Sequence, residues 1–189
     1  MSAAVHTAVR AGIKRIHFIA PTTTDFHDVN VEGKSGIFAT CGRDPRPRWV
    51  SSRRRLEWPN GAMCVFFSGE EPESLRGPQA EMVIVDEIAR MRYQQSVFDT
   101  MMLGLRLGDR PRILTATPRI TPFMEKLVTM DDVRITTGST DDNAEHLSAG
   151  FLKKLRELCE GTRLGRSGAT RRDDPRPHAR AVQGRLADP

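Results

Sequence analysis

The segment MVIV at residues 82–85 constrains the fold more than any other part of the sequence, because it contains no polar residue. A run of this length predicts a strand that is buried on both faces, as is typical of parallel sheets covered by helices on each side. Two carboxylates, Asp86 and Glu87, follow the run directly. The segment therefore predicts an inner strand of an α/β fold, with an acidic pair where the strand ends.

The rest of the chain alternates between strand-like and helix-like patterns. The Asn60-Gly61 pair favours the type I′ turn of a β-hairpin. Strands are predicted at residues 14–20, 52–58, 62–67, 82–85, 112–117 and 133–137, and helices at residues 3–11, 22–32, 96–105, 122–129 and 148–159. Because strands and helices alternate, the predicted fold class is α/β, with a mostly parallel sheet flanked by helices and one β-hairpin.

The charge balance narrows the choice of partners without selecting one. The net charge is +5 and the isoelectric point is about 9.6, which suits a polyanion such as nucleic acid but also follows from an arginine-rich composition alone. Three scattered cysteines without metal-ligand spacing favour a reducing cytosol. No apolar run approaches the ~20 residues of a membrane span. We therefore expect a cytoplasmic protein.

The composition changes near residue 167. Residues 1–166 are predicted to form one domain. Residues 167–189 contain five Arg, three Asp and three Pro but almost no large apolar residue. Because such a composition cannot bury a core, we expect this basic tail to be disordered.

The acidic pair resembles the Walker B pattern of P-loop ATPases, in which an apolar strand ends in two acids. In that pattern Asp86 would hold Mg²⁺, usually through water, because Mg²⁺ prefers oxygen ligands and keeps part of its hydration shell. Glu87 would orient and deprotonate the water that attacks the γ-phosphate of ATP. The place also suits a site, because ligands of open α/β sheets bind beyond the carboxyl ends of the strands. Two solvated acids in a turn are the alternative.

Two further segments supply candidate residues. The segment Thr115-Ala116-Thr117 ends a predicted strand, and helicase-like ATPases carry such a segment beside Walker B, where hydroxyls sense the γ-phosphate and couple hydrolysis to movement. Threonines that cap the next helix are the alternative. Arg76 lies ten residues before Asp86, and a guanidinium can stabilise the charge of phosphoryl transfer. An ordinary surface arginine is the alternative there.

The triplet Gly33-Lys34-Ser35 looks like the end of a phosphate-binding P-loop, but its surroundings do not fit. A complete P-loop has another glycine five positions earlier, where this chain has Asp28, an acid that would repel phosphate. The triplet also follows a predicted helix instead of opening one, so carbonyl groups gather there in place of N–H groups. We therefore expect Gly33 to be a helix C-cap, and we expect the triplet not to hold nucleotide.

Basic side chains also gather in the predicted hairpin. The run Arg53-Arg54-Arg55 lies close in sequence to Trp58, and arginines beside an aromatic residue can contact DNA phosphates. A solvated hairpin explains the same pattern. The sequence therefore leaves the DNA-binding residues unassigned.

Taken together, these segments resemble the ATPase domain of the terminase large subunits of tailed phages, the motors that pump DNA into the procapsid. The resemblance covers residues 13–166 and is closest to the form found in prophages and gene transfer agents. Its carriers are IAPTTTDFHDVNVEG, RRRLEWPNGA, EEPESLRGPQAE, VIVDEIARMRY, LGLRLGDRPRILTATPRITP, RITTGSTDDN and CEGTRLGR. The resemblance implies a P-loop NTPase-like fold, and the GLRLGDRPR and LRGPQ segments argue against a helicase-like ATPase outside phage biology.

The resemblance also implies roles for individual residues. Asp86 is similar to the Walker B metal acid, and Glu87 to the catalytic glutamate. Thr115-Ala116-Thr117 looks like the coupling motif. Arg76 stands where some members of the family place an arginine finger, which acts on the ATP of a neighbouring subunit.

Cofactors and partners follow from the same resemblance. The family implies ATP and Mg²⁺, double-stranded DNA, a small terminase subunit, the portal and a homo-oligomer. It also implies action in the cytoplasm of a bacterial host.

The resemblance is to the central part of a motor domain. In the family the P-loop lies upstream of IAPTTTDF, and a nuclease domain follows the region of Arg166. We therefore expect an incomplete P-loop NTPase-like domain. The alternative to a working motor component is a non-catalytic remnant, or one piece of a split terminase, that at most binds DNA or a partner chain.

Overall fold

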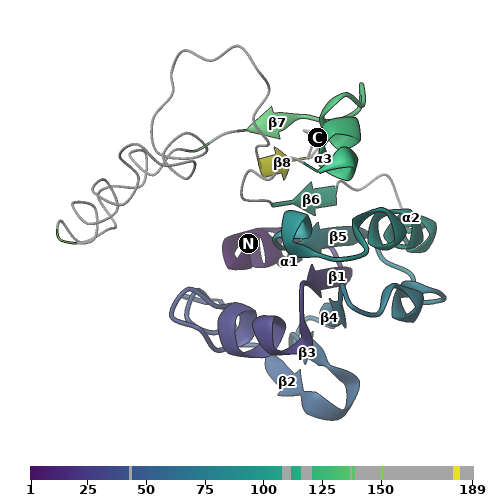
Figure 1. The fold of residues 1–189 in the computed structure, drawn as a ribbon. Coiled ribbons are helices and arrows are strands. Elements are labelled where there is room, and N and C mark those ends of the chain that lie inside the picture. Colours follow the sequence, from purple (N-terminus) through teal and green to yellow (C-terminus); the bar gives the residue numbers. More distant parts are fainter. Residues whose placement is uncertain are drawn as a thin grey trace.

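The structure is a computed structural model, and it describes residues 1–42, 44–107, 112–115, 121–136, 138, 150 and 181–183. Within this part of the chain, eight strands form one sheet in the order β2-β3-β4-β1-β5-β6-β8-β7 (Figure 1). The strands are β1 (Arg15–Ala20), β2 (Arg48–Val50), β3 (Arg55–Glu57), β4 (Met63–Ser68), β5 (Met82–Val85), β6 (Arg112–Leu114), β7 (Ile135–Thr136) and β8 (Ala181–Gln183).

The centre of the sheet is parallel. Strands β4, β1, β5 and β6 run in the same direction, and the register pairs Ile19 with Val85 and Val85 with Leu114. Strands β2 and β3 add antiparallel strands on one side, and β8 and β7 add them on the other. The predicted α/β fold is confirmed, and the sheet is mixed, with its parallel strands in the middle. Because these strands are parallel, their carboxyl ends meet at one edge of the sheet.

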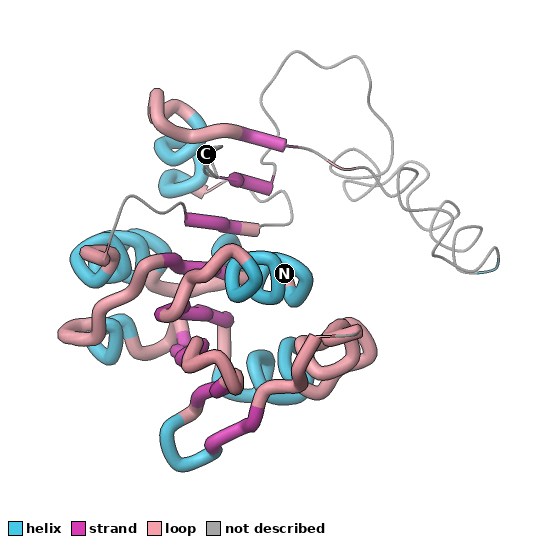
Figure 2. The backbone as a smooth tube through the Cα atoms, turned by 180° about the vertical axis from the view of Figure 1, so that it is seen from behind, coloured by secondary structure: helices cyan, strands magenta, loops and turns pink. Residues whose placement is uncertain are grey.

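Helices cover both faces of the sheet (Figure 2). They are α1 (Ser2–Arg10), α2 (Gln94–Gly104) and α3 (Pro122–Val128), the π-helix η1 (Asp25–Val31), and the 3₁₀ helices η2 (Ser51–Arg53), η3 (Pro72–Leu75) and η4 (Ile88–Arg90). Helices α1 and η1 pack on one face, where Phe18 of β1 is fully buried. Helices α2 and α3 pack on the other face, against Ile19 and Val83.

The inner strands are buried as their sequences predict. All four residues of β5 are buried, and only Arg15 of β1 is exposed. Alternate side chains of β1 point to opposite faces, so both helical layers receive apolar side chains from the same strand. Burying one such Val or Ile stabilises the fold by about 1.5–3 kcal/mol. The positions of β1 and β5 at the centre of the sheet follow from this burial.

Several expected elements differ from the structure. The predicted strand at residues 52–58 begins within the 3₁₀ helix η2 and is a strand only at Arg55–Glu57. The predicted helix at residues 22–32 contains a π-helix, in which the Glu32 amide donates to the carbonyl of His27. The tail predicted to be disordered includes strand β8, whose backbone pairs with β6 and β7. The rest of this tail lies outside the described residues, so its disorder stays a prediction. The predicted helix at residues 148–159 lies outside the described residues.

Candidate active site

The carboxyl edge of the sheet brings together residues from two separate sequence segments. Asp86 follows β5 and Thr115 follows β6, and these strands are neighbours. The Thr115 hydroxyl donates a hydrogen bond of 2.8 Å to Oδ1 of Asp86. The same hydroxyl oxygen accepts a bond of 3.1 Å from the backbone N–H of Glu87. One hydroxyl group therefore joins both acids of the predicted pair to the predicted coupling segment.

Backbone hydrogen bonds fix this arrangement further. The Asp86 amide donates to the carbonyl of Ile19 at 2.8 Å, and the Thr115 amide donates to the carbonyl of Val85 at 2.9 Å. The Ile88 amide donates to the carbonyl of Thr115 at 3.0 Å. Asp86 and Glu87 are half-buried. Asp86 and Glu87, which we call the acidic turn, are thus held by hydrogen bonds from both neighbouring strands, β1 and β6.

Glu87 has an uncommon backbone conformation. Its φ of 52° and ψ of 48° lie in the left-handed region, which costs a residue other than glycine roughly 1–3 kcal/mol. The hydrogen bonds of the Glu87 and Ile88 amides to Thr115 offset part of this cost. Strain of this kind is common at active sites, because it persists only where the surroundings hold it in place.

Further residues around the acidic turn were not found from the sequence. The Gln94 side chain donates to the carbonyl of Ala89 at 3.0 Å and accepts from the Thr121 hydroxyl at 2.8 Å. Asp25 and Arg90 form an ion pair at 3.7 Å. Thr121 stands before Pro122 and caps α3, which is a recognisable start signal. Nothing in the sequence around Gln94 marks it as a link between this helix and the acidic turn.

Arg76 is not part of this hydrogen-bonded group. Arg76 follows η3 at the surface, where its guanidinium pairs with Glu73 at 2.8 Å and its side chain is 66% exposed. Ala116 and Thr117 lie outside the described residues. The structure therefore joins three of the six predicted site residues, namely Asp86, Glu87 and Thr115.

The Gly33-Lys34-Ser35 triplet lies in turns after η1, as predicted, and no helix begins there. The carbonyl of Ser35 accepts from the hydroxyl of Ser2 at 2.8 Å, which ties the segment to α1. The expected C-cap is wrong by one position, because Glu32 caps η1. Gly33 is needed for a different reason: a Cβ there would overlap the backbone carbonyl of Val29.

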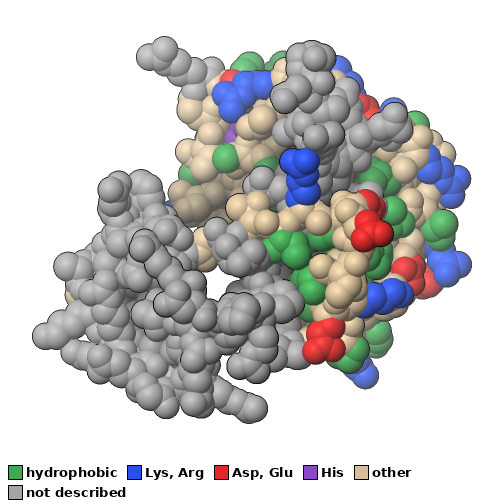
Figure 3. Space-filling view, turned by 90° about the horizontal axis from the view of Figure 1, so that it is seen from above, with side chains coloured by type: hydrophobic (Ala, Val, Ile, Leu, Met, Phe, Trp, Pro, Cys, Tyr) green, Lys and Arg blue, Asp and Glu red, His purple; other side chains and the backbone are tan. Residues whose placement is uncertain are grey.

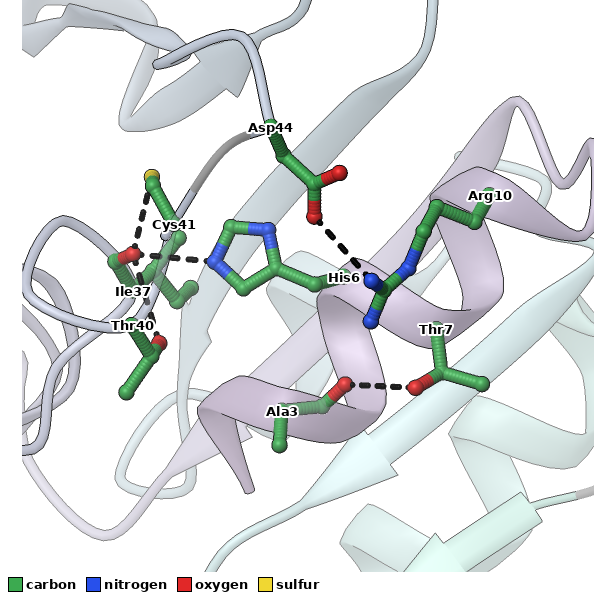
Figure 4. Close-up of polar contacts among 8 residues, drawn as sticks. All are labelled: Ala3, His6, Thr7, Arg10, Ile37, Thr40, Cys41 and Asp44. Carbon is green, nitrogen blue, oxygen red and sulfur yellow. Dashed lines mark hydrogen bonds and ion pairs between the residues drawn. The ribbon is translucent and has the colours of Figure 1, made fainter.

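The chain after this triplet is also held against α1 (Figure 4). The carbonyl of Ile37 lies 2.9 Å from Nε2 of His6 and 3.2 Å from the Sγ of Cys41. Arg10 pairs with Asp44 at 3.5 Å. The segment therefore packs against a helix. The amides of Gly36 and Ile37 donate to the carbonyls of Gly33 and Asn30, so these N–H groups are already used within the segment.

The donors at the acidic turn suit a hard cation that keeps most of its water. Asp86 offers one carboxylate, and the Thr115 hydroxyl lies beside it. In the described ranges, no three His, Cys, Asp or Glu side chains lie together as a ready-made metal site. Mg²⁺ is commonly held by one or two carboxylates together with phosphate oxygens and water. The residues present therefore fit Mg²⁺ that arrives with a phosphate ligand.

A family model described as "Terminase large subunit, T4likevirus-type, N-terminal" matches residues 3–168. The structure is similar to that of the large terminase from a thermophilic bacteriophage, with a TM-score of 0.69 at 14% identity, covering 83% of this chain and 40% of that one. It also matches the Thermus phage P74-26 large terminase ATPase domain, with a TM-score of 0.49 at 18% identity, covering 67% of this chain and 57% of that one. A comparison with curated proteins finds no match.

The chain covers only part of each of these two structures. The chain spans 40% of the length of the large terminase from the thermophilic bacteriophage and 57% of the length of the Thermus phage ATPase domain. Among the helices that the structure describes, none has the length and apolar character needed to cross a bilayer.

Proposed function

The chain belongs to the T4-like terminase large subunits and corresponds to their N-terminal part, and from this premise we propose that it supplies part of the ATP site of a DNA-packaging motor. The observation that carries the proposal is the Thr115 hydroxyl, which contacts the Asp86 carboxylate and the Glu87 amide at once. The two hydrogen bonds link the two acids to the end of β6, and this supports metal binding by Asp86, catalysis by Glu87 and coupling through Thr115.

Each residue then has a role that its geometry suits. Oδ1 of Asp86 is engaged by Thr115, which orients the carboxylate so that its other oxygen can hold a Mg²⁺-bound water. Mg²⁺ would supply positive charge beside the phosphate oxygens of ATP. Glu87, placed by its left-handed backbone, accepts a proton from the attacking water. Arg76 is exposed, as action on the ATP of a neighbouring subunit requires.

We assign the coupling of ATP hydrolysis to movement to Thr115, which follows β6. When the surroundings of the γ-phosphate change, a shift of Thr115 would move both acids, because it is bonded to both. Ala116 and Thr117 would carry that shift toward α3 and its capping residue Thr121. Force on DNA therefore begins, in this proposal, as a displacement of β6 relative to β5.

The partners follow from the family. We propose double-stranded DNA, a small terminase subunit, the portal and further copies of this chain as partners, in the cytoplasm of a bacterial host. The prophage or gene transfer agent setting belongs to the same proposal. The positive net charge of +5 is compatible with a nucleic-acid partner.

The role of the acidic turn is tested by ATP turnover in the terminase assembled with this chain, DNA and its partner subunits. We expect Glu87→Gln to lower turnover by about 10²–10⁴-fold, the range for loss of a general base. Thr115→Val removes two hydrogen bonds and should lower turnover strongly, whereas Thr115→Ser keeps the hydroxyl and should retain most of it. Turnover that is unchanged in Glu87→Gln would exclude this assignment.

A second function is favoured by the Gly33-Lys34-Ser35 segment. The segment follows η1 instead of opening a helix, and the amides of Gly36 and Ile37 already donate to backbone carbonyls, which argues against a cradle of N–H groups for phosphate. The chain by itself would then bind DNA or a partner chain without hydrolysing ATP. We expect no ATP turnover above background by the purified chain, and turnover that Glu87→Gln abolishes would contradict this.

A further inference from the structure

The hairpin formed by β2 and β3 ends in an exposed turn, which we call the hairpin tip and define as Ser51, Ser52, Arg53 and Arg54. All four residues are exposed. We propose that the hairpin tip is a contact for the phosphate backbone of double-stranded DNA. The proposal rests on the packaging function and adds a binding site to it.

The register of the strands places the hairpin tip at the carboxyl edge of the sheet, where the acidic turn also lies. Arg55 of β3 pairs with Val65 of β4, and the Phe66 amide donates to the carbonyl of Arg54 at 2.9 Å. Because β4 continues to Ser68 in the opposite direction to β3, the tip lies near the carboxyl end of β4. Asp86 and Thr115 follow the carboxyl ends of β5 and β6, so the tip and the acidic turn share one edge of the sheet.

The charge of the hairpin tip is not neutralised by its surroundings. Residues 48–57 contain four Arg and one Glu, a net charge of +3. The single acid, Glu57, is engaged by Arg48 at 2.7 Å and by Arg55, and these hydrogen bonds hold the pKa of Glu57 below its usual value. Among the described residues, no ion pair involves Arg53 or Arg54. These two guanidinium groups are therefore available to an anionic partner.

The backbone of the hairpin tip is held in an uncommon conformation. Arg54 has a φ of 46° and a ψ of 52°, and in the described part of the chain only Arg54 and Glu87 combine a side chain with a positive φ. Glycine would adopt this conformation without strain. An arginine kept there in spite of the strain supports a role for its side chain.

The hairpin is anchored firmly behind its tip. Trp49 of β2 packs against Phe66, with ring centroids 5.6 Å apart, and against Phe26 of η1 at 6.3 Å. The Phe66 amide of β4 donates the hydrogen bond that holds the carbonyl of Arg54. Because the backbone of the tip is already ordered, binding loses little conformational entropy beyond that of the arginine side chains.

The chemistry of the hairpin tip matches phosphate oxygens. A guanidinium group can donate two parallel hydrogen bonds to a phosphate, and serine hydroxyls can donate as well. Among the described residues on the face drawn in Figure 3, basic and acidic side chains are interspersed and form no continuous basic patch. The expected contact is therefore local and independent of base sequence.

The test measures binding of the purified chain to a short duplex of arbitrary sequence, by fluorescence anisotropy at several salt concentrations. The tip variant is Arg53→Ala with Arg54→Gly, because glycine keeps the left-handed conformation. The control is Lys14→Gln with Arg15→Gln, which removes two exposed charges at the amino end of β1, the opposite edge. Thermal unfolding of both variants confirms that each one folds.

We expect the tip variant to bind on the order of tenfold more weakly near physiological salt. The slope of log affinity against log salt should fall in magnitude by about 2, close to 0.9 for each lost phosphate contact. The control should keep the slope of the wild type. A tip variant with the wild-type slope overturns the proposal, as does a control that lowers the slope equally.

A polyglutamate competitor decides between DNA and an acidic protein as the partner of the hairpin tip. DNA binding that survives equal charge concentrations of polyglutamate supports the proposal. Tip-dependent binding of polyglutamate without binding of DNA overturns it. Neither measurement uses ATP, so failure of the tip proposal leaves the Glu87→Gln test of the acidic turn unaffected.

Discussion

Replacing Gly33 by alanine is expected to lower the free energy of unfolding by about 2–3 kcal/mol, the cost of forcing extra atoms into a packed site. A Cβ at Gly33 would overlap the backbone carbonyl of Val29 and lie 3.1 Å from its carbon atom. A backbone carbonyl cannot turn aside as a flexible side chain can. The melting temperature should fall by about 5–10 °C for a chain of this size.

Lys34→Ala is the matched control for this change. Lys34 is exposed, and an exposed substitution usually changes stability by less than about 0.5 kcal/mol. If Gly33-Lys34-Ser35 were a phosphate cradle, Lys34→Ala would instead weaken nucleotide binding and leave stability alone. Thermal unfolding and a fluorescent-nucleotide titration of both variants separate the two cases. A stable Gly33→Ala variant would contradict the packing argument.

Acid is expected to destabilise the fold through His17. Burial lowers the pKa of His17 from 6.5 to about 4, and its ring packs edge-on against Phe67 at 4.8 Å between centroids. The unfolded chain therefore takes up a proton at a higher pH than the folded chain does. Stability should decline as the pH falls from about 6.5 to about 4, by about 3 kcal/mol in all.

His17→Met isolates this contribution, because methionine fills a similar volume and does not titrate. Denaturant unfolding at pH 7 and near pH 4 gives the free energy of unfolding for both proteins. The wild type should lose about 3 kcal/mol more than the variant over this range. Other groups titrate in both proteins and cancel in the comparison. Parallel pH curves for the two proteins would show that His17 titrates normally in the fold.

The acidic turn was only partly predictable. The apolar run before Asp86 and Glu87 correctly predicted an inner strand, and the parallel strands placed their ends at one edge. No spacing in the sequence indicates that the Thr115 hydroxyl would meet both acids, because the contact spans 28 and 29 residues. The left-handed conformation of Glu87 could not be predicted either, since local propensity disfavours it for glutamate.

For the Gly33-Lys34-Ser35 triplet, the sequence predicted the position after a helix but not the contacts that hold the segment. Local rules argue against a P-loop at Gly33-Lys34-Ser35, because Asp28 occupies the position of the first glycine and the triplet follows a predicted helix; the structure places the triplet in turns after η1. The contacts that hold this segment, from Ser2 and His6 of α1, join residues about 30 positions apart. They depend on how α1 packs across the sheet, so no local pattern predicts them.

Runs of apolar residues and their alternation with helices were sufficient for the α/β class, for the central strands β1 and β5, and for the acidic pair at a strand end. These features depend on local propensity and on burial, which a sequence pattern records directly. The order of the strands, the pairing of the tail strand β8 with β6 and β7, and the meeting of Thr115 with Asp86 and Glu87 came from the packed structure alone. They depend on contacts between distant segments, whose free energies are gained only after the chain has folded back on itself.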